Sequence, residues 1–245
     1  MLLAAVAITV GFFIGAVGVG GILLIPPLVL LGGMEIHQAA ATALFSFLFT
    51  GLAGTWLFQR RGSIDWNMTV PVCTGAVVFS YLGAMVNSMV GARMLALVIA
   101  LIIVCAGAYI LLPVAPGAGA RRDGKSNGQQ LLLLAVGAAS GFGSGLSGAG
   151  GPLFSVPIML LLGFVPLAAI GTSQVLQIVA AIAGTAGNLQ YGSVDFQTAA
   201  WITAFELVGV VAGTRAAHAV SVTALRRMAA GLCIAVGLFM LARSL

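Results

Sequence analysis

Two glycine-rich clusters are the residues of this sequence whose type and spacing most clearly predict chemistry. They read Gly-Val-Gly-Gly at 18–21 and Gly-Ala-Gly-Gly at 148–151, and each is followed by a proline six residues after its last glycine. Both stand in the middle of a long apolar run. A break there would leave a helix end with unpaired N–H groups and a positive dipole end, which an anion can approach closely because glycine has no Cβ. The clusters therefore predict a site for a small oxyanion, whereas the alternative is that these glycines only allow close helix crossing.

Neutral polar side chains in the apolar run after each cluster could add hydrogen-bond donors to such a site. Gln174 and Gln177 lie one turn apart and share a helical stripe with Asn188. Hydroxyl and amide groups can hold an anion without burying a positive charge, although hydrogen bonding between helices is the alternative role for any single threonine or serine. The substrate-binding residues predicted in this way are Gly18, Gly20, Gly21, Thr42, Ser46, Gly148, Gly150, Gly151, Thr172, Ser173, Gln174 and Gln177.

Few titratable residues stand near these runs. Glu206 is the only acidic residue well inside one, and we expect it to serve either in proton coupling or in a structural pairing with a neighbouring helix. Asp65 and Asp195 follow Gly-Ser at the start of a run and are expected to cap helices. His37 and His218 lie near the ends of runs without metal-ligating company, so we expect no metal and no cofactor.

An enzyme is the main competing class, because Gly145-Leu146-Ser147-Gly148 matches the G-x-S-G sequence of rhomboid-type intramembrane serine proteases. His218 is a conceivable base for Ser147. Four residues are a weak match in a chain with 34 glycines, and the counterpart of Ser147 in the first half of the chain is Val17. The surrounding glycines recur in both halves, so the duplicated feature is the backbone break and not a nucleophile, and we expect no enzyme.

The elements that must position these residues follow from an extreme composition. Of 245 residues, 61% are hydrophobic and only 6% are charged, against about 25% charged residues in a soluble domain. Such a surface has to be solvated by lipid, so the sequence predicts an all-α polytopic membrane protein. The net charge of +5 is scattered over short connections and predicts no nucleic-acid partner. The eight predicted apolar blocks are 1–31, 37–59, 67–90, 93–113, 130–162, 167–190, 197–217 and 223–243.

The chain contains an internal repeat at an offset of 130 residues, and residues 11–65 match residues 141–195 without a gap. The repeat divides the blocks into two homologous sets of four. These are a first transmembrane repeat at 1–113 and a second at 130–245, joined by a loop at 114–129. Blocks one and five are long for a single span and carry the glycine clusters near their middle, so we expect re-entrant or broken helices there.

Basic residues distinguish parallel from inverted repeats. If every block crosses, they divide six against four between the two sides, which is nearly no bias. If blocks one and five are re-entrant, the second half is inverted and the basic residues divide eight against two. The positive-inside rule therefore favours inverted repeats with both termini non-cytoplasmic. The eight are Arg60, Arg61, Arg121, Arg122, Lys125, Arg215, Arg226 and Arg227, and the two are Arg93 and Arg243.

The motifs of the two repeats resemble those of the sulfite exporter TauE/SafE family of bacterial and archaeal membrane transporters. The pattern G-x-x-G-x-G-G with a later proline runs from Gly15 to Pro27 and again from Gly145 to Pro157. Each is followed by A-x-x-T and by G-S-[IV]-D, and the resemblance covers essentially the whole chain. It implies movement of a sulfur-containing anion, such as sulfite or an organosulfonate, without fixing the substrate.

The expected function is a secondary transporter that moves such an anion across the bacterial inner membrane by alternating access. A passive anion channel of the same architecture is the alternative. The expected partners are the small anion and the lipid bilayer, and homo-oligomer formation is left open. The first repeat has Leu44 and Phe47 where the second has Gln174 and Gln177, so a site built on these positions would be asymmetric.

Overall fold

The computed structural model describes residues 2–18, 20–111, 126–219 and 222–244, and within these ranges all regular structure is helical. The predicted all-α class is confirmed for this part of the chain. The helices are α1 Leu2–Val17, the short 3-10 helix η1 Gly21–Leu24, α2 Ile25–Leu30, α3 Ile36–Arg60, α4 Trp66–Met89, α5 Ala92–Leu111, α6 Asn127–Ser147, α7 Pro152–Leu161, α8 Pro166–Tyr191, α9 Phe196–Ala219 and α10 Val222–Ser244.

Helices break at both glycine clusters, where the sequence predicts interruptions. α1 ends at Val17, and Gly18 turns the chain with a φ of 73° before η1 and α2 follow. α6 ends at Ser147, and Gly148 and Gly150 have φ angles of 67° and 80° before α7 begins. These are left-handed conformations that residues with a Cβ rarely adopt, so glycine lets the chain turn inside each block.

Capping side chains set the beginnings of three helices. Asp65 and Asp195 each accept a hydrogen bond from a backbone N–H group in the first turn of α4 and α9, at 2.9 and 3.0 Å, as predicted. Ser126 caps α6 in the same way, with a distance of 3.3 Å. Because of this cap, α6 begins at Asn127 and not at residue 130, where the apolar block was expected to start.

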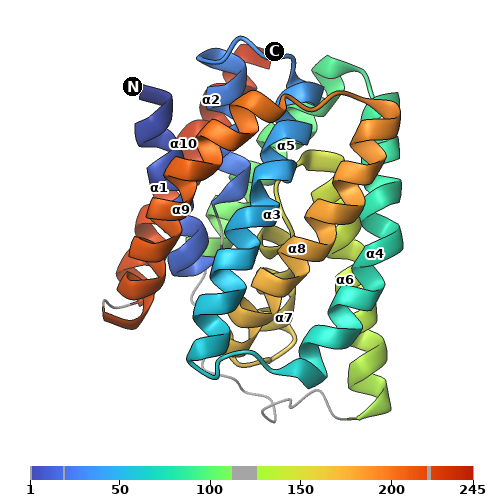
Figure 1. Cartoon of the computed structure of the whole chain (residues 1–245), viewed down its shortest axis with the longest axis vertical. Helices are drawn as coiled ribbons and strands as arrows, with labels where there is room; N and C mark the ends of the chain where they lie inside the picture. Colours follow the sequence, from blue (N-terminus) through green and yellow to red (C-terminus); the bar gives the residue numbers. More distant parts are fainter. Residues whose placement is uncertain (1, 19, 112–125, 220–221, 245) are drawn as a thin grey trace.

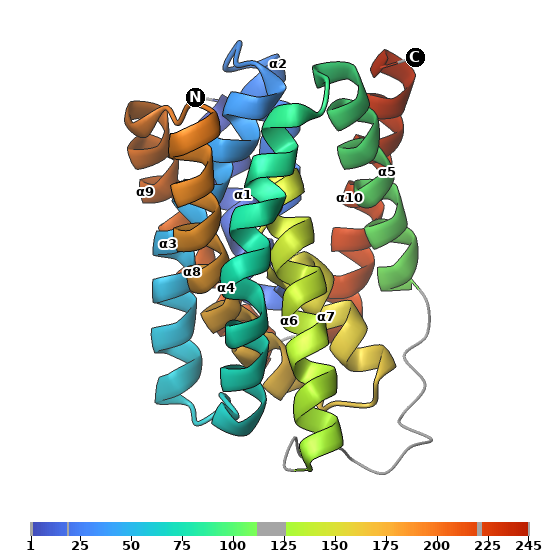
Figure 2. The ribbon, with the colours of Figure 1, turned by 90° about the vertical axis from the view of Figure 1, so that its right-hand side faces the viewer.

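The helices run between two ends of the molecule, which are named upper and lower after their places in Figure 1. Both termini lie at the upper end, together with the connections after α2, α4 and α8, whereas the connections after α3 and α7 lie at the lower end (Figure 1). α1 enters from the upper end and α2 returns to it, while α6 enters from the lower end and α7 returns to it (Figure 2). α3 runs downward and α8 runs upward beside it, so these two helices are antiparallel.

The first helix of each half packs along the third long helix of the other half. α1 lies against α9, and α6 lies against α4. A Cβ atom built on Gly11 would lie 2.8 Å from Cα of Glu206, and one built on Gly141 would lie 2.8 Å from Cα of Ala76. Gly141 and Glu206 are the repeat counterparts of Gly11 and Ala76, so the same contact occurs twice in the molecule. Glycine is needed at both crossings because any side chain would push the helices apart.

The distribution of polar groups is the reverse of that in a soluble protein. Gln174 and Glu206 are completely buried, whereas 60% of Val78 and 57% of Leu101 are exposed on the outer surface. Within the described residues, six helices are long and apolar enough to cross a membrane, namely α3, α4, α5, α6, α8 and α9. The chain is therefore a multi-pass membrane protein whose outer surface contacts lipid and whose interior holds the polar side chains.

Candidate functional site

The two glycine breaks meet in the interior of the molecule. A Cβ atom built on Gly21 would lie 2.6 Å from the carbonyl oxygen of Ala149, in the second break, and 2.8 Å from Cζ of Phe47. One built on Gly150 would lie 3.2 Å from Cδ2 of the same ring. The ring of Phe47, on α3, therefore lies against both breaks, and the lack of side chains on these glycines lets the two segments approach each other.

The other glycines of the clusters also face close neighbours. A Cβ atom on Gly148 would lie 2.6 Å from Cα of Ala40, and one on Gly20 or Gly151 would come within 2.9 Å of a neighbouring side chain. Gly18 differs from Gly20, Gly148 and Gly151. The atom nearest to its Cβ position is 3.5 Å away, which is an ordinary contact distance. In this conformation the cluster backbone thus packs closely on the protein, which is the alternative role that the sequence left open.

Gln174 and Gln177 reach from α8 to the first break and to α3. The side-chain amide of Gln174 donates to the carbonyl oxygen of Ile14 at 3.3 Å, and that oxygen also accepts from the backbone N–H of Gly18 at 3.0 Å. Gln177 donates to the carbonyl oxygen of Phe47 at 3.0 Å and to the hydroxyl of Thr50 at 2.7 Å. Both amides are therefore held at the point where the breaks meet, and each donates to protein oxygens there.

Ser173 joins α8 to the second break. Its hydroxyl lies 2.7 Å from the hydroxyl of Ser155 on α7, and it donates to the carbonyl oxygen of Ala169 at 2.7 Å. Ser155 in turn donates to the carbonyl oxygen of Gly151 at 3.0 Å. Ser155 was not among the predicted site residues, although it stands only four positions after the second cluster, which is the signal that could have identified it.

No described hydrogen bond joins the two glutamines to Thr42, Thr172 or Ser46. The hydroxyl of Thr42 accepts from the backbone N–H of Asp195, near the upper end, at 3.1 Å. The hydroxyl of Thr172 lies 3.0 Å from that of Thr69, near the lower end. These two repeat counterparts therefore lie toward opposite ends of the molecule, each beside the connection that precedes a neighbouring helix.

Glu206 is buried inside the helix bundle with no hydrogen-bond partner for either carboxyl oxygen among the described residues. The neighbouring hydroxyl of Ser46 donates instead to the carbonyl oxygen of Ala43 in its own helix, at 2.8 Å. Gly11 of α1 packs against the backbone of Glu206. A buried carboxyl group is costly for the fold, so Glu206 stays a candidate for the predicted role in proton coupling.

Three buried serines on α4 and α6 were missed by the sequence reasoning. Ser80, Ser140 and Ser144 are completely buried, and their hydroxyls have no hydrogen-bond partner among the described residues. A Cβ atom on Gly141 would lie 2.8 Å from the hydroxyl oxygen of Ser80. Ser140 and Ser144 stand one turn apart just before the second glycine cluster, and this spacing could have drawn attention to them.

Ser147 has a structural role at the end of α6. Its hydroxyl donates to the carbonyl oxygen of Gly143 at 2.6 Å and accepts from the backbone N–H of Ala149 at 3.3 Å. These hydrogen bonds satisfy backbone groups that would otherwise be unpaired where the helix breaks. The side chain of His218, which was considered as a base for this serine, lies outside the described residues.

Comparisons with known proteins identify similar chains. The profile of the family described as "Sulfite exporter TauE/SafE" matches residues 3–240. The "Probable membrane transporter protein YdhB" of Bacillus subtilis (strain 168) is 27% identical over 220 residues, which cover 88% of this chain and 89% of the relative. The "Probable membrane transporter protein YunE" of the same organism is 25% identical over 108 residues, covering 44% of this chain and 40% of the relative. No solved structure matches the chain.

Proposed function

Because the chain belongs to the sulfite exporter TauE/SafE family of membrane transporters, we propose that it is a secondary transporter for a small sulfur-containing anion, sulfite or an organosulfonate. The observation that carries this proposal is the meeting of the two glycine breaks beside Gln174 and Gln177. Broken helices that meet near the middle of a membrane protein are the usual place for a substrate site in transporters with internal repeats.

An inverted relation between the repeats 1–113 and 130–245 underlies the proposed mechanism. Two observations support it. α3 and α8, the second long helices of the two halves, run in opposite directions (Figures 1 and 2). The contact of Gly11 with Glu206 is repeated by that of Gly141 with Ala76. In this arrangement, one re-entrant pair enters from each side of the bilayer, and rocking of one part against the other exposes the site alternately.

We assign the lower end to the cytoplasm, so that both termini are non-cytoplasmic and the membrane is the bacterial inner membrane. Arg60 and Arg61 stand where α3 finishes, and Arg215 and Arg227 stand near the junction of α9 and α10, all at the lower end of their helices (Figure 1). Arg93, by contrast, stands in the first turn of α5, at the upper end. The assignment satisfies the positive-inside rule.

In the substrate-bound state, the anion would be held by neutral donors. The amides of Gln174 and Gln177 now donate to the carbonyl oxygens of Ile14 and Phe47. Separation of α8 from α1 and α3 would free these donors for the anion. Hydrogen bonds from neutral groups replace part of the anion's hydration without fixing it permanently, which suits a site that has to release its substrate.

The two ends of the molecule differ in a way that fits alternating access. A pocket of about 260 Å³, the upper pocket, opens at the upper end and is lined by Asn188 among others. The counterpart of Asn188 is Phe58, which is fully buried at the lower end in a cluster with Ile64, Val156 and Ile170. This cluster, the lower seal, would close the cytoplasmic side while the upper side stands open.

Counterflow in proteoliposomes tests the proposal. Liposomes carrying the purified protein and loaded with unlabelled sulfite are given labelled sulfite outside. We expect saturable uptake that the internal sulfite stimulates and that a proton gradient accelerates. A channel would give flux without saturation and without stimulation from the far side. Normal counterflow in both Gln177→Ala and Gly150→Leu would contradict the central site.

A further inference from the structure

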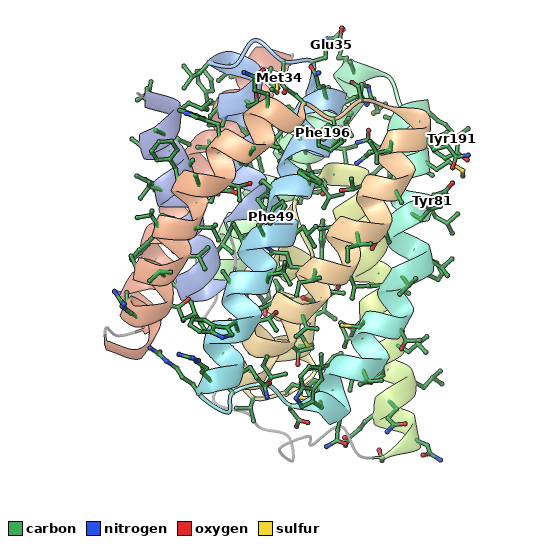
Figure 3. All side chains as sticks on the ribbon, in the orientation of Figure 1. Met34, Glu35, Phe49, Tyr81, Tyr191 and Phe196 are labelled. Carbon is green, nitrogen blue, oxygen red and sulfur yellow. The ribbon has the colours of Figure 1, made fainter. Side chains whose placement is uncertain are left out.

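The upper pocket is a second polar site, separate from the meeting point of the breaks. It lies between the beginning of α3 and the ends of α4 and α8. Two of the amide side chains that line it, Asn87 and Asn188, are only 4% and 5% exposed. Figure 3 shows Glu35 and Tyr191, two further lining residues, at this upper end of the molecule. Its other polar side chains are His37, Gln38, Ser88 and Ser193.

A chain of hydrogen bonds fixes the protonation pattern of His37. The Nδ2 amide group of Asn87 donates to the carbonyl oxygen of Leu146 at 2.6 Å. The Oδ1 atom of Asn87 therefore faces His37, whose Nδ1 lies 3.0 Å away. Because Oδ1 can only accept, Nδ1 of His37 carries a hydrogen, and Nε2 is the ring nitrogen left to take up a proton.

The beginning of α3 supplies further attraction for an anion. The first N–H groups of a helix have no partner within it, and they lie at the positive end of the helix dipole. Glu35 is the N-cap residue, but its side chain makes no capping hydrogen bond. Its carboxylate is exposed at the pocket and repels an anion. The titratable groups that line the pocket are Glu35, which precedes α3, His37 on α3 and Tyr191 on α8, and α4 contributes none.

We propose that the upper pocket binds a small sulfur oxyanion when His37 is protonated, and that it is the outer substrate subsite of the transporter. This inference rests on the proposed function and adds a second anion-binding site to the same transport pathway. With neutral His37, Glu35 is the charged group that lines the pocket, and Arg93 of α5 lines a neighbouring pocket together with Glu35. With protonated His37, the two charges cancel, and the N–H groups of α3 and the amide and hydroxyl side chains favour the anion. The affinity for the anion is therefore higher when His37 is protonated than when it is neutral.

Asn87 also connects the pocket to the second glycine break. Leu146, whose carbonyl oxygen accepts from Asn87, stands two positions before Gly148, where the backbone turns. The counterparts of His37 and Asn87 at the lower end are Leu167 and Ala217, which have no polar side chain. The subsite thus belongs to the upper end alone, and it was not predicted from the sequence because its members come from three separate helices.

Anion binding to the full-length protein in lipid nanodiscs tests this proposal. The probe is methanesulfonate, whose charge stays the same between about pH 5.5 and about pH 8, a range that spans the usual titration of histidine. We expect the affinity of the native protein to be about tenfold or more higher at the acidic pH. His37→Gln should bind weakly at both pH values, and Glu35→Gln should bind more tightly than the native protein at the higher pH. His218→Gln, which removes the other histidine, should keep the native pH dependence.

Binding that is independent of pH in the native protein, or a pH dependence that survives in His37→Gln, would overturn the subsite.

A nitrogen NMR spectrum of histidine-labelled native protein provides a test that needs no variant to fold. It should show the Nδ1–H tautomer for one of the two histidines, and two Nε2–H tautomers would contradict the assignment. Sulfite counterflow in the same preparations separates the two proposals. If counterflow is intact but methanesulfonate does not bind as expected, only the subsite proposal is wrong. If the native protein shows no counterflow, the proposed transport function itself is contradicted.

Discussion

The side-chain amide of Gln177 donates a hydrogen bond of 3.0 Å to the carbonyl oxygen of Phe47, a residue 130 positions earlier in the chain. This separation equals the offset of the internal repeat, so the two bonded residues are counterparts of each other. In a structure built from two related halves, counterparts can touch only where they lie close to the symmetry axis. In the proposed inverted arrangement this bond lies on the axis that relates the repeats, at the point where the two glycine breaks meet.

Replacement of Gln177 by leucine should weaken substrate binding. The variant keeps the size of the side chain but removes the donor to Phe47 and Thr50 at the proposed anion site. The loss of a buried hydrogen bond costs about 1–2 kcal/mol, so we expect a roughly tenfold higher sulfite concentration for half-maximal counterflow. Gln197→Leu, which changes an exposed glutamine in the first turn of α9, is the matched control and should behave as the native protein. Equal behaviour of both variants would show that the Gln177 amide does not bind the substrate.

Two glycine variants separate close packing from backbone strain. Gly148 and Gly163 have φ angles of 67° and 86°. Alanine at either position is therefore destabilised by about 1–2 kcal/mol, because a residue with a Cβ is strained in the left-handed conformation. A Cβ atom at Gly163 has nothing within 4 Å, whereas one at Gly148 would lie 2.6 Å from Cα of Ala40. We expect Gly148→Ala to lose about 1–3 kcal/mol more stability than Gly163→Ala in denaturant unfolding of the solubilised protein. Equal losses would mean that the contact with Ala40 relaxes without cost.

The breaks could be predicted from the sequence because their cause is local. Gly18 and Gly148 turn the chain by their own backbone freedom, and their duplication distinguished them from the many other glycines. The caps Asp65 and Asp195 were likewise predictable, since an N-cap bonds to N–H groups only a few residues away.

The partners of the polar side chains could not be predicted, because helical spacing shows which residues share a face but not which helix lies opposite. Thr42 and Thr172 occupy equivalent positions, yet one bonds to the backbone of Asp195 and the other to the hydroxyl of Thr69. The pairing of His37 with Asn87 joins residues 50 positions apart and depends on how α3 and α4 are packed.

Glu206→Gln tests the predicted role of Glu206 in proton coupling. Glutamine keeps the shape of the side chain and cannot exchange a proton, so sulfite accumulation driven by a proton gradient should fall to the level of gradient-free liposomes. Sulfite counterflow should persist, because an exchange of like anions needs no net proton movement. Glu206→Asp retains a titratable group and should respond partly to the gradient. Unchanged gradient-driven accumulation in Glu206→Gln would rule out the coupling role.

Asp195 should make the stability of α9 depend on acidic pH. The backbone N–H of Thr198, and next its hydroxyl, donate to this carboxylate and hold its pKa below the usual value. A lowered pKa means that the stabilisation is present above the usual range for aspartate and is lost as the pH falls through the folded-state pKa. Asp195→Asn keeps a capping oxygen that does not titrate. The native protein should therefore lose more Tm than Asp195→Asn between neutral pH and about pH 3. Parallel loss in both proteins would contradict a role for this carboxylate.

Exchange of one side chain between the two ends should shift the balance of conformations. Phe58 closes the lower seal, while its counterpart Asn188 lines the upper pocket. Asparagine at 58 removes apolar packing from the seal, and a loss of about 2 kcal/mol changes the ratio of two conformations by roughly 30-fold. The reporter is labelling of Ala41→Cys, in the upper pocket, by a membrane-impermeant maleimide, with the native cysteines changed to serine.

Labelling of this reporter should fall several-fold in Phe58→Asn, because opening of the lower end closes the upper pocket in alternating access. Asn188→Phe should lower it as well, since the larger side chain fills the pocket directly. The two variants then differ in transport: Phe58→Asn should retain counterflow, whereas Asn188→Phe should slow it by obstructing the pathway. Phe49→Asn, a change at an exposed phenylalanine of the same helix (Figure 3), is the matched control and should leave labelling unchanged. If Phe58→Asn leaves the labelling of Ala41→Cys unchanged, the two ends open independently of each other, as they would in a channel.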